Sequence, residues 1–174
     1  MAAVVPKSNG CVKMVDATFE EGAESPLYLS ALDDSSLKVI SALLQDAVFT
    51  GSDMRYDPKD RSFALLLNRF RWEDRENAQK RRRAYERVRA IVRFADILRV
   101  GSQGIDRADK DLVLSLLDIA FEAGEDGTGR IVLTLAGDGA IALEVECLDV
   151  TLRDVTRPYA AISGKLPMHP ELSD

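Results

Sequence analysis

The chain has 174 residues, enough for one ordinary domain and too few for two large independent ones. Hydrophobic residues make up 46% of it and charged residues 30%, which is the composition of a folded globular protein. The formal net charge of -6 argues against wholesale binding to nucleic acid or to a membrane surface. No segment approaches the roughly 18 consecutive apolar residues of a membrane span.

The two ends of the chain are predicted to lie outside the folded domain. Residues 1–25 mix glycine, serine, lysine and acids without a sustained period, so we expect a flexible N-terminal arm. Residues 158–174 are predicted to form an extended C-terminal tail. The first residues lack the basic flank and long apolar run of a secretory signal, so we expect a cytoplasmic protein with reduced thiols at Cys11 and Cys147.

An amphipathic helix is predicted over residues 35–49. Residues 33–36 carry side-chain oxygens that can accept the unsatisfied N–H groups of a first helical turn. Apolar residues then recur at offsets of 3, 7, 10 and 11, which places them on one face. Gly51 is the predicted stop. The residues of the apolar face are Leu37, Ile40, Leu44, Ala47 and Val48.

After this helix the apolar period changes to two, and turn residues follow at strand-sized intervals, which is typical of antiparallel sheet. The glycine-rich segments 124–129 and 137–139 suit tight hairpin turns. Residues 76–93 stay open between helix and strand, because their arginine, glutamate and alanine favour a helix while their second half alternates. The predicted strands are 27–32, 54–56, 62–72, 85–100, 112–123, 131–136 and 140–155.

The sequence therefore predicts an α+β protein, mainly an antiparallel β-sheet with one N-terminal amphipathic helix, in a single domain of residues 26–157. Residues 92–97 match residues 145–150 in their alternation and in an aspartate near the end. The match allows two similar β-rich halves, 26–105 and 106–157, although alternating strands also look alike by composition.

Several cofactor-dependent and metal-dependent chemistries are disfavoured. The only histidine, His169, lies in the predicted tail, and two distant cysteines are too few for a zinc site. Residues 137–142 match the letters of a dinucleotide fingerprint but lead into alternating residues rather than a helix. We expect no cofactor and no metal.

The strongest local signal is charge. Residues 69–99 contain 11 Lys or Arg against 5 Asp or Glu, a net charge of +6, so the rest of the chain carries -12. If Arg69, Arg71, Arg89 and Arg93 share the outer face of adjacent strands, they form a surface for phosphate or carboxylate groups. The candidate residues for binding an anion or a partner are Arg69, Arg71, Arg81, Arg82, Arg83, Arg89 and Arg93.

Two classes of function fit this pattern. The first is a non-catalytic binding or scaffolding protein that uses segment 69–99 for an acidic protein or anionic ligand; nucleic acid is disfavoured because the whole domain is acidic. Such a protein can also form a homodimer through an exposed strand edge. The alternative is a small enzyme that uses Asp96, Asp149 and arginines in a pocket. As an alternative to binding a partner, the arginines can form ion pairs with acidic residues of the same chain.

Three segments carry a resemblance to a known family: residues 68–73 (NRFRWE), residues 86–89 (ERVR) with Phe94 and Asp96, and residues 104–106 (GID). Together they resemble a family of small proteobacterial proteins with a domain of unknown function. The resemblance covers about residues 27–157. It implies a bacterial, cytoplasmic setting and transfers no site residue.

Overall fold

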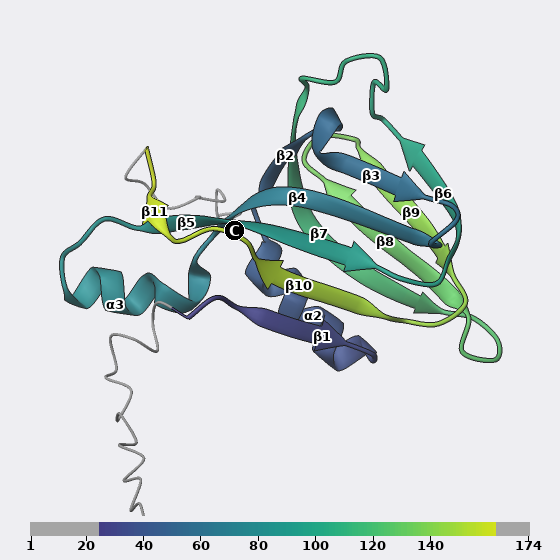
Figure 1. Cartoon of the computed structure of the whole chain (residues 1–174), viewed down its shortest axis with the longest axis horizontal. Coiled ribbons are helices and arrows are strands. Elements are labelled where there is room, and N and C mark those ends of the chain that lie inside the picture. Colours follow the sequence, from purple (N-terminus) through teal and green to yellow (C-terminus); the bar gives the residue numbers. More distant parts are fainter. Residues whose placement is uncertain (1–24, 163–174) are drawn as a thin grey trace, which may run out of the picture.

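The chain forms one antiparallel sheet that curls around an apolar core, with a helix packed against it (Figure 1). This computed structural model describes residues 25–162. The expected α+β class, dominated by antiparallel sheet, is confirmed. The predicted N-terminal arm apart from Ser25, and most of the predicted tail with His169, lie outside the described residues. Within the described part, no helix is long and apolar enough to cross a membrane.

The sheet follows one continuous hydrogen-bonded path of strands. In spatial order the path runs through β1 (Tyr28–Ala31), β10 (Val150–Asp154), β5 (Glu86–Phe94), β4 (Ser62–Phe70), β2 (Val48–Thr50), β7 (Val113–Ala123), β8 (Gly129–Leu135), β9 (Ala140–Val145) and β6 (Ile97–Gln103). Two short strands lie off the path: β3 (Met54–Asp57) pairs with β4, and β11 (Tyr159–Ala160) pairs with β5. Both predicted glycine-rich turns join hairpins, β7 to β8 and β8 to β9.

Two strands that the sequence predicts as continuous are each broken by a corner. The predicted strand 85–100 divides into β5 and β6 at Asp96, whose φ of 54° is left-handed. The predicted strand 140–155 divides into β9 and β10 across residues 146–149. The prediction of unbroken strands was wrong because apolar alternation continues through a corner, while an aspartate that tolerates a left-handed conformation redirects the backbone.

The amphipathic helix predicted over residues 35–49 is present as α2 (Asp34–Leu44). Its N-cap is Asp33, whose side chain accepts the backbone N–H of Ser36 at 2.7 Å. The helix ends earlier than predicted, because Asp46 has a φ of 61° and the chain then enters β2. Its buried residues are Leu37, Ile40, Ser41 and Leu44.

Neither alternative for residues 76–93 holds over the whole segment. Strand β4 is followed by a 3-10 turn, η2 (Trp72–Asp74), and a short helix, α3 (Arg75–Lys80), before β5 begins. A second 3-10 turn, η1 (Gly51–Asp53), precedes β3. The structure therefore adds a second helix to the one that the sequence predicts, where helix formers precede the alternating residues.

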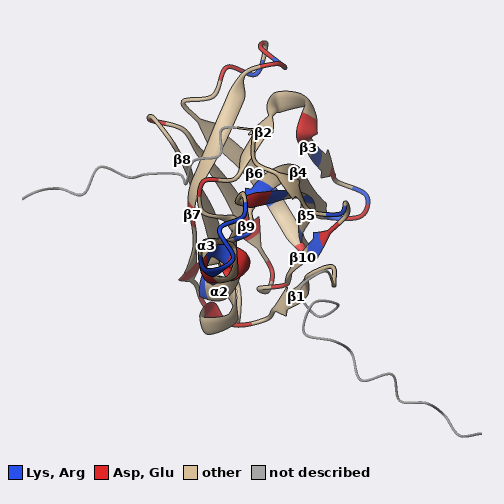
Figure 2. Ribbon diagram, turned by 90° about the vertical axis from the view of Figure 1, so that its left-hand side faces the viewer, with Lys and Arg blue, Asp and Glu red and all other residues tan. Residues whose placement is uncertain are grey.

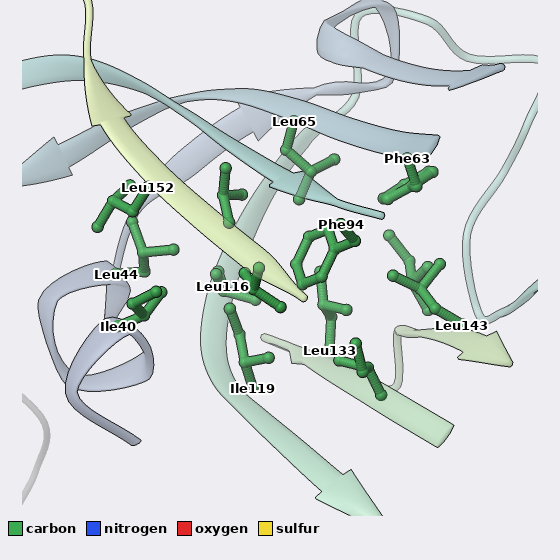
Figure 3. Packing of buried hydrophobic residues seen from close by; sticks show 14 of the residues in the cluster. Ile40, Leu44, Phe63, Leu65, Phe94, Leu116, Ile119, Leu133, Leu143 and Leu152 are labelled. Carbon is green, nitrogen blue, oxygen red and sulfur yellow. The ribbon is translucent and has the colours of Figure 1, made fainter. Parts of the chain in front are cut away.

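The core lies between the two halves of the curled sheet and α2 (Figure 3). Leu65 of β4 and Phe94 of β5 are fully buried there, and Ile40 of α2 packs near Ile119 of β7. Burying a side chain of this size contributes roughly 1.5–3 kcal/mol relative to leaving it exposed. A core of this kind needs no disulfide or metal to hold the sheet in its curled form.

Candidate functional site

The predicted arginines do not share one face of the sheet. In the β4–β5 register, Asn68 lies opposite Arg89 and Ala64 opposite Arg93, whereas Arg69 lies opposite Val88, which is buried. Arg69 therefore points to the inner face, and its exposed fraction is 0%. The expectation that Arg69 joins Arg89 and Arg93 on an outer surface is wrong, because successive strand residues face opposite sides.

Arg69 is enclosed by two carboxylates. Its Nε and Nη2 donate to the two oxygens of Asp154, each at 2.9 Å. Its Nη1 and Nη2 donate to the two oxygens of Glu73, at 2.9 and 2.7 Å. Both contacts are bidentate, the arrangement in which arginine binds carboxylates most strongly. This cluster joins β4 to β10 and to the turn η2.

Burial and pairing oppose each other in this cluster. Removal from water by itself lowers the pKa of Arg69, but the hydrogen bonds and charges of Glu73 and Asp154 outweigh it and raise that pKa. Burial likewise acts to raise the pKa of Glu73, yet the hydrogen bonds and charge of Arg69 bring it below its ordinary value. Arg69 and Glu73 therefore both stay charged at neutral pH.

Two further predicted arginines hold the connection between β4 and β5 in place. Arg71, which is 8% exposed, donates to Glu86 at the start of β5. Arg83 donates to both oxygens of the buried Asp74, at 2.5 and 2.6 Å. Arg71 thus links the end of β4 to β5, and Arg83 links the turn after α3 to η2 and, at 3.3 Å, to Glu86 of β5.

The outer-face arginines are more accessible. Arg93 pairs with Asp60 at 2.7 Å, and Arg89 lies 3.9 Å from Asp53. The side chains of Arg89 and Arg93 are 48% and 42% exposed, so solvent weakens both ion pairs. These two residues present positive charge on the outer face of β5.

Four exposed basic side chains gather at α3 and the turn after it. We call this group the basic turn; its members are Arg75, Lys80, Arg81 and Arg82. The neighbouring acids Glu73 and Asp74 are already bound to Arg69 and Arg83. Figure 2 shows the resulting concentration of basic residues around α3. Of the sequence-predicted set, the structure exposes Arg81 and Arg82 at this end of the molecule.

The two matching aspartates both lie in the corners. Ala95 N donates to Asp149 O at 2.9 Å, and Glu146 N donates to Asp96 O at 3.0 Å, so the corners are hydrogen-bonded to each other. Neither carboxylate lines the cavity described below. The likeness of the two segments thus reflects equivalent places in the fold, while a duplication of two halves stays a prediction, as does catalysis by Asp96 and Asp149.

The thiol of Cys147 also lies at this corner. Cys147 Sγ donates to Asp96 Oδ2 at 3.1 Å. That hydrogen bond, together with partial removal from water and the negative charges of Asp96, Asp149 and Glu146, raises the pKa of the thiol. A thiol that resists deprotonation is a poor nucleophile. Among the residues that the structure describes, no group of three or more His, Cys, Asp or Glu is placed to hold a metal ion.

A cavity of about 310 Å³ lies elsewhere, between β3 and β6. The sequence analysis missed it, because its walls come from strands that are distant along the chain. Apolar residues such as Met54, Phe63 and Ile141 look like ordinary core residues in the sequence. The only sequence signal is the charged loop 106–111 beside them, which has no period of its own.

The fold and these sites define an antiparallel β protein with a buried arginine–carboxylate cluster, an exposed basic turn and one edge cavity. The chain belongs to the family described as Protein of unknown function (DUF2948), whose model matches residues 27–169. The expected resemblance to a family with a domain of unknown function is thereby confirmed. Searches of the curated proteins and of the solved structures found no significant match.

We expect Asp154→Ala to lower the free energy of unfolding by about 3–5 kcal/mol, because it leaves a buried guanidinium short of one of its two carboxylates. Urea denaturation followed by circular dichroism measures the loss. Asp60→Ala is the matched control: it removes an exposed partner of Arg93 and should cost about 0–1 kcal/mol. Equal losses in the two variants would contradict a stabilising role for the buried cluster.

We expect Asp96→Asn to speed the alkylation of Cys147, because the substitution replaces the charged acceptor by a neutral amide and removes the negative charge that helps to raise the pKa of the thiol. Asparagine tolerates the left-handed backbone at this position, so the corner is preserved. The measurement is the iodoacetamide rate against pH in a Cys11→Ser background, with Asp149→Asn as the control of smaller effect. An unchanged pH profile in Asp96→Asn would show that this contact does not govern the thiol.

Proposed function

We propose that the chain is a non-catalytic binding or scaffolding protein whose basic turn contacts an acidic or anionic partner. One observation carries the proposal: exposed basic side chains gather on and after α3, while the neighbouring acids Glu73 and Asp74 are bound to Arg69 and Arg83. Glu76 does pair with Lys80 at 3.8 Å, but both side chains are largely exposed, so solvent weakens this ion pair. The four basic residues outnumber this one acid, so the basic turn keeps a net positive charge that can attract a partner.

The arginines of segment 69–99 fall into a paired, structural group and an exposed group, which supports this proposal. Arg69, Arg71 and Arg83 position the segment, because they attach it to β10, β5 and the buried Asp74. Arg81 and Arg82 lie at its exposed end, and Arg89 and Arg93 add charge from the outer face of β5. A segment whose backbone is held by such contacts has less conformational freedom to lose when it binds, which favours affinity.

An acidic protein is the partner that we propose over a nucleic acid. Outside residues 69–99 the chain has a net charge of -12, which repels a long polyanion more than it repels a compact acidic patch. The aromatic residues that flank the basic turn, Trp72 and Tyr85, pack against Phe70, so their rings are engaged within the chain rather than presented for base stacking, a common element of single-strand recognition.

We expect Arg81→Gln/Arg82→Gln to reduce binding of a fluorescent poly-glutamate peptide, because the double variant removes two exposed charges and leaves Arg69 and Arg83 in place. Fluorescence anisotropy at low and moderate salt measures the affinity, and a labelled single-stranded RNA tests the other class of polyanion. Arg99→Gln/Arg130→Gln is the control, with the same charge change on β6 and β8. Equal, salt-insensitive binding by both double variants would refute the proposal.

We further propose a homodimer formed through the edge of β1, which hydrogen-bonds only to β10 within the described part of the sheet. Tyr28 and Leu32 are 66% and 69% exposed at this edge, and identical antiparallel edges are self-complementary. Tyr28→Lys/Leu32→Glu should lower the mass measured by light scattering over a concentration series, whereas Val39→Lys on α2 should not. A constant monomer mass in the unmodified chain would exclude this dimer.

A further inference from the structure

The cavity between β3 and β6 occupies a place where the curled sheet is not closed by strand pairing. Within the described residues β3 pairs with β4 and β6 with β9, and Figure 1 shows β3 and β6 flanking the same side of the molecule. Two backbone hydrogen bonds join the two sides near the ends of the cavity. Ile97 N donates to Arg61 O at 2.9 Å, and Ser52 N donates to Lys110 O at 3.1 Å.

The walls of this cavity are mostly apolar. They include an aromatic ring from β3 and another from β4, and side chains from β6, β9 and the following loop. The volume of about 310 Å³ is at the small end of the roughly 300–1,000 Å³ typical of small-molecule sites. Such walls favour a compact hydrocarbon or aromatic group, because its transfer from water is favourable. The apolar lining residues are Met54, Tyr56, Phe63, Val100, Ile105 and Ile141.

Positive charge is positioned at the rim. Arg107 donates from Nε and Nη2 to Ser102 Oγ on β6, at 3.0 and 2.8 Å, which holds its guanidinium beside the cavity. Lys110 also lines the rim. Among the described residues, neither of these two side chains has a carboxylate within 4.0 Å. Their charges are therefore available to a ligand.

The acidic side chains at the rim accept hydrogen bonds from the backbone of their own loop. Asp106 Oδ1 accepts the backbone N–H of Ala108 at 2.9 Å, and Asp109 Oδ1 accepts that of Asp111 at 3.1 Å. These contacts stabilise the loop itself and partly satisfy the negative charge. An anionic group that enters the cavity thus finds donors at Arg107 and Lys110, whereas one oxygen of each of these two acids already accepts a backbone N–H of the loop.

We propose that this cavity binds a small apolar carboxylic acid, with its hydrocarbon part between β3 and β6 and its carboxylate on Arg107 and Lys110. The site is separate from the basic turn, and it is independent of the acidic partner proposed above. A carboxylate on a guanidinium at the mouth of an apolar cavity combines a charge-assisted hydrogen bond with burial of the hydrocarbon.

Titration of the full chain with octanoate, followed by amide chemical shifts, tests the location and the chemistry. We expect saturable shifts in β3, β6 and loop 104–111, with 1-octanol binding more weakly and octylammonium weakest. The proposal is overturned if octanoate gives no saturable shift, if the shifts map to other elements, or if octylammonium binds as well as octanoate. Poly-glutamate binding by the same sample reports separately on the basic turn.

Single variants distinguish the contribution of the Arg107 charge to binding from that of the apolar cavity. Arg107→Gln should weaken octanoate about tenfold, the loss expected for one charge-assisted contact, and should leave 1-octanol unchanged. Arg99→Gln removes the same charge from β6 outside the cavity lining and should change neither ligand. Ser102→Trp should fill the mouth and weaken both, with thermal unfolding as the check on its fold. Equal octanoate affinity in Arg107→Gln and Arg99→Gln would refute the carboxylate contact.

Discussion

The buried guanidinium of Arg69 constrains the rest of this molecule. A cation on the inner face of a sheet is strongly unfavourable unless carboxylates surround it. Asp154 supplies one from β10, and its Oδ2 also accepts the N–H of Leu27, ahead of β1. Glu73 supplies the other, which requires the chain to fold back directly after β4. The 3-10 turn and α3 therefore stand where a simple hairpin would otherwise join β4 to β5.

This constraint divides the positive segment into an inner and an outer part. The inner arginines are matched by acids of the same segment and of β10, so their charges cancel locally and contribute to the fold rather than to recognition. Glu73 and Asp74 are bound to Arg69 and Arg83, while Arg81 and Arg82 are exposed. Segment 69–99 thus combines a high net positive charge with a set of internal ion pairs. The arginines differ in role because they differ in register.

Sequence patterns predicted the elements whose causes are local. α2 follows from the N-cap at Asp33 and the apolar period, and the hairpin turns follow from residues that tolerate positive φ, such as Gly137 with a φ of 77°. The inner position of Arg69 could also be predicted from the sequence, because Arg69 continues the alternation of Leu65 and Leu67. The prediction failed because an arginine is usually assigned to the outer face of a sheet. The break at Asp96 and the cavity walls depend on tertiary contacts, which alternation does not record.

The edge cavity follows from the way in which the sheet curls. The corners carry β5 into β6 and β9 into β10, and their mutual hydrogen bonds hold the two halves of the sheet at a fixed separation. Within the described residues the short β3 and the longer β6 are left as edges that do not pair with each other, and backbone hydrogen bonds join the two sides near Arg61 and Ile97 and near Ser52 and Lys110. Unpaired edges invite pairing with other chains unless they are short, charged or covered. Here the charged loop 106–111 covers the far end, so the same segment that protects the edge also encloses an apolar space.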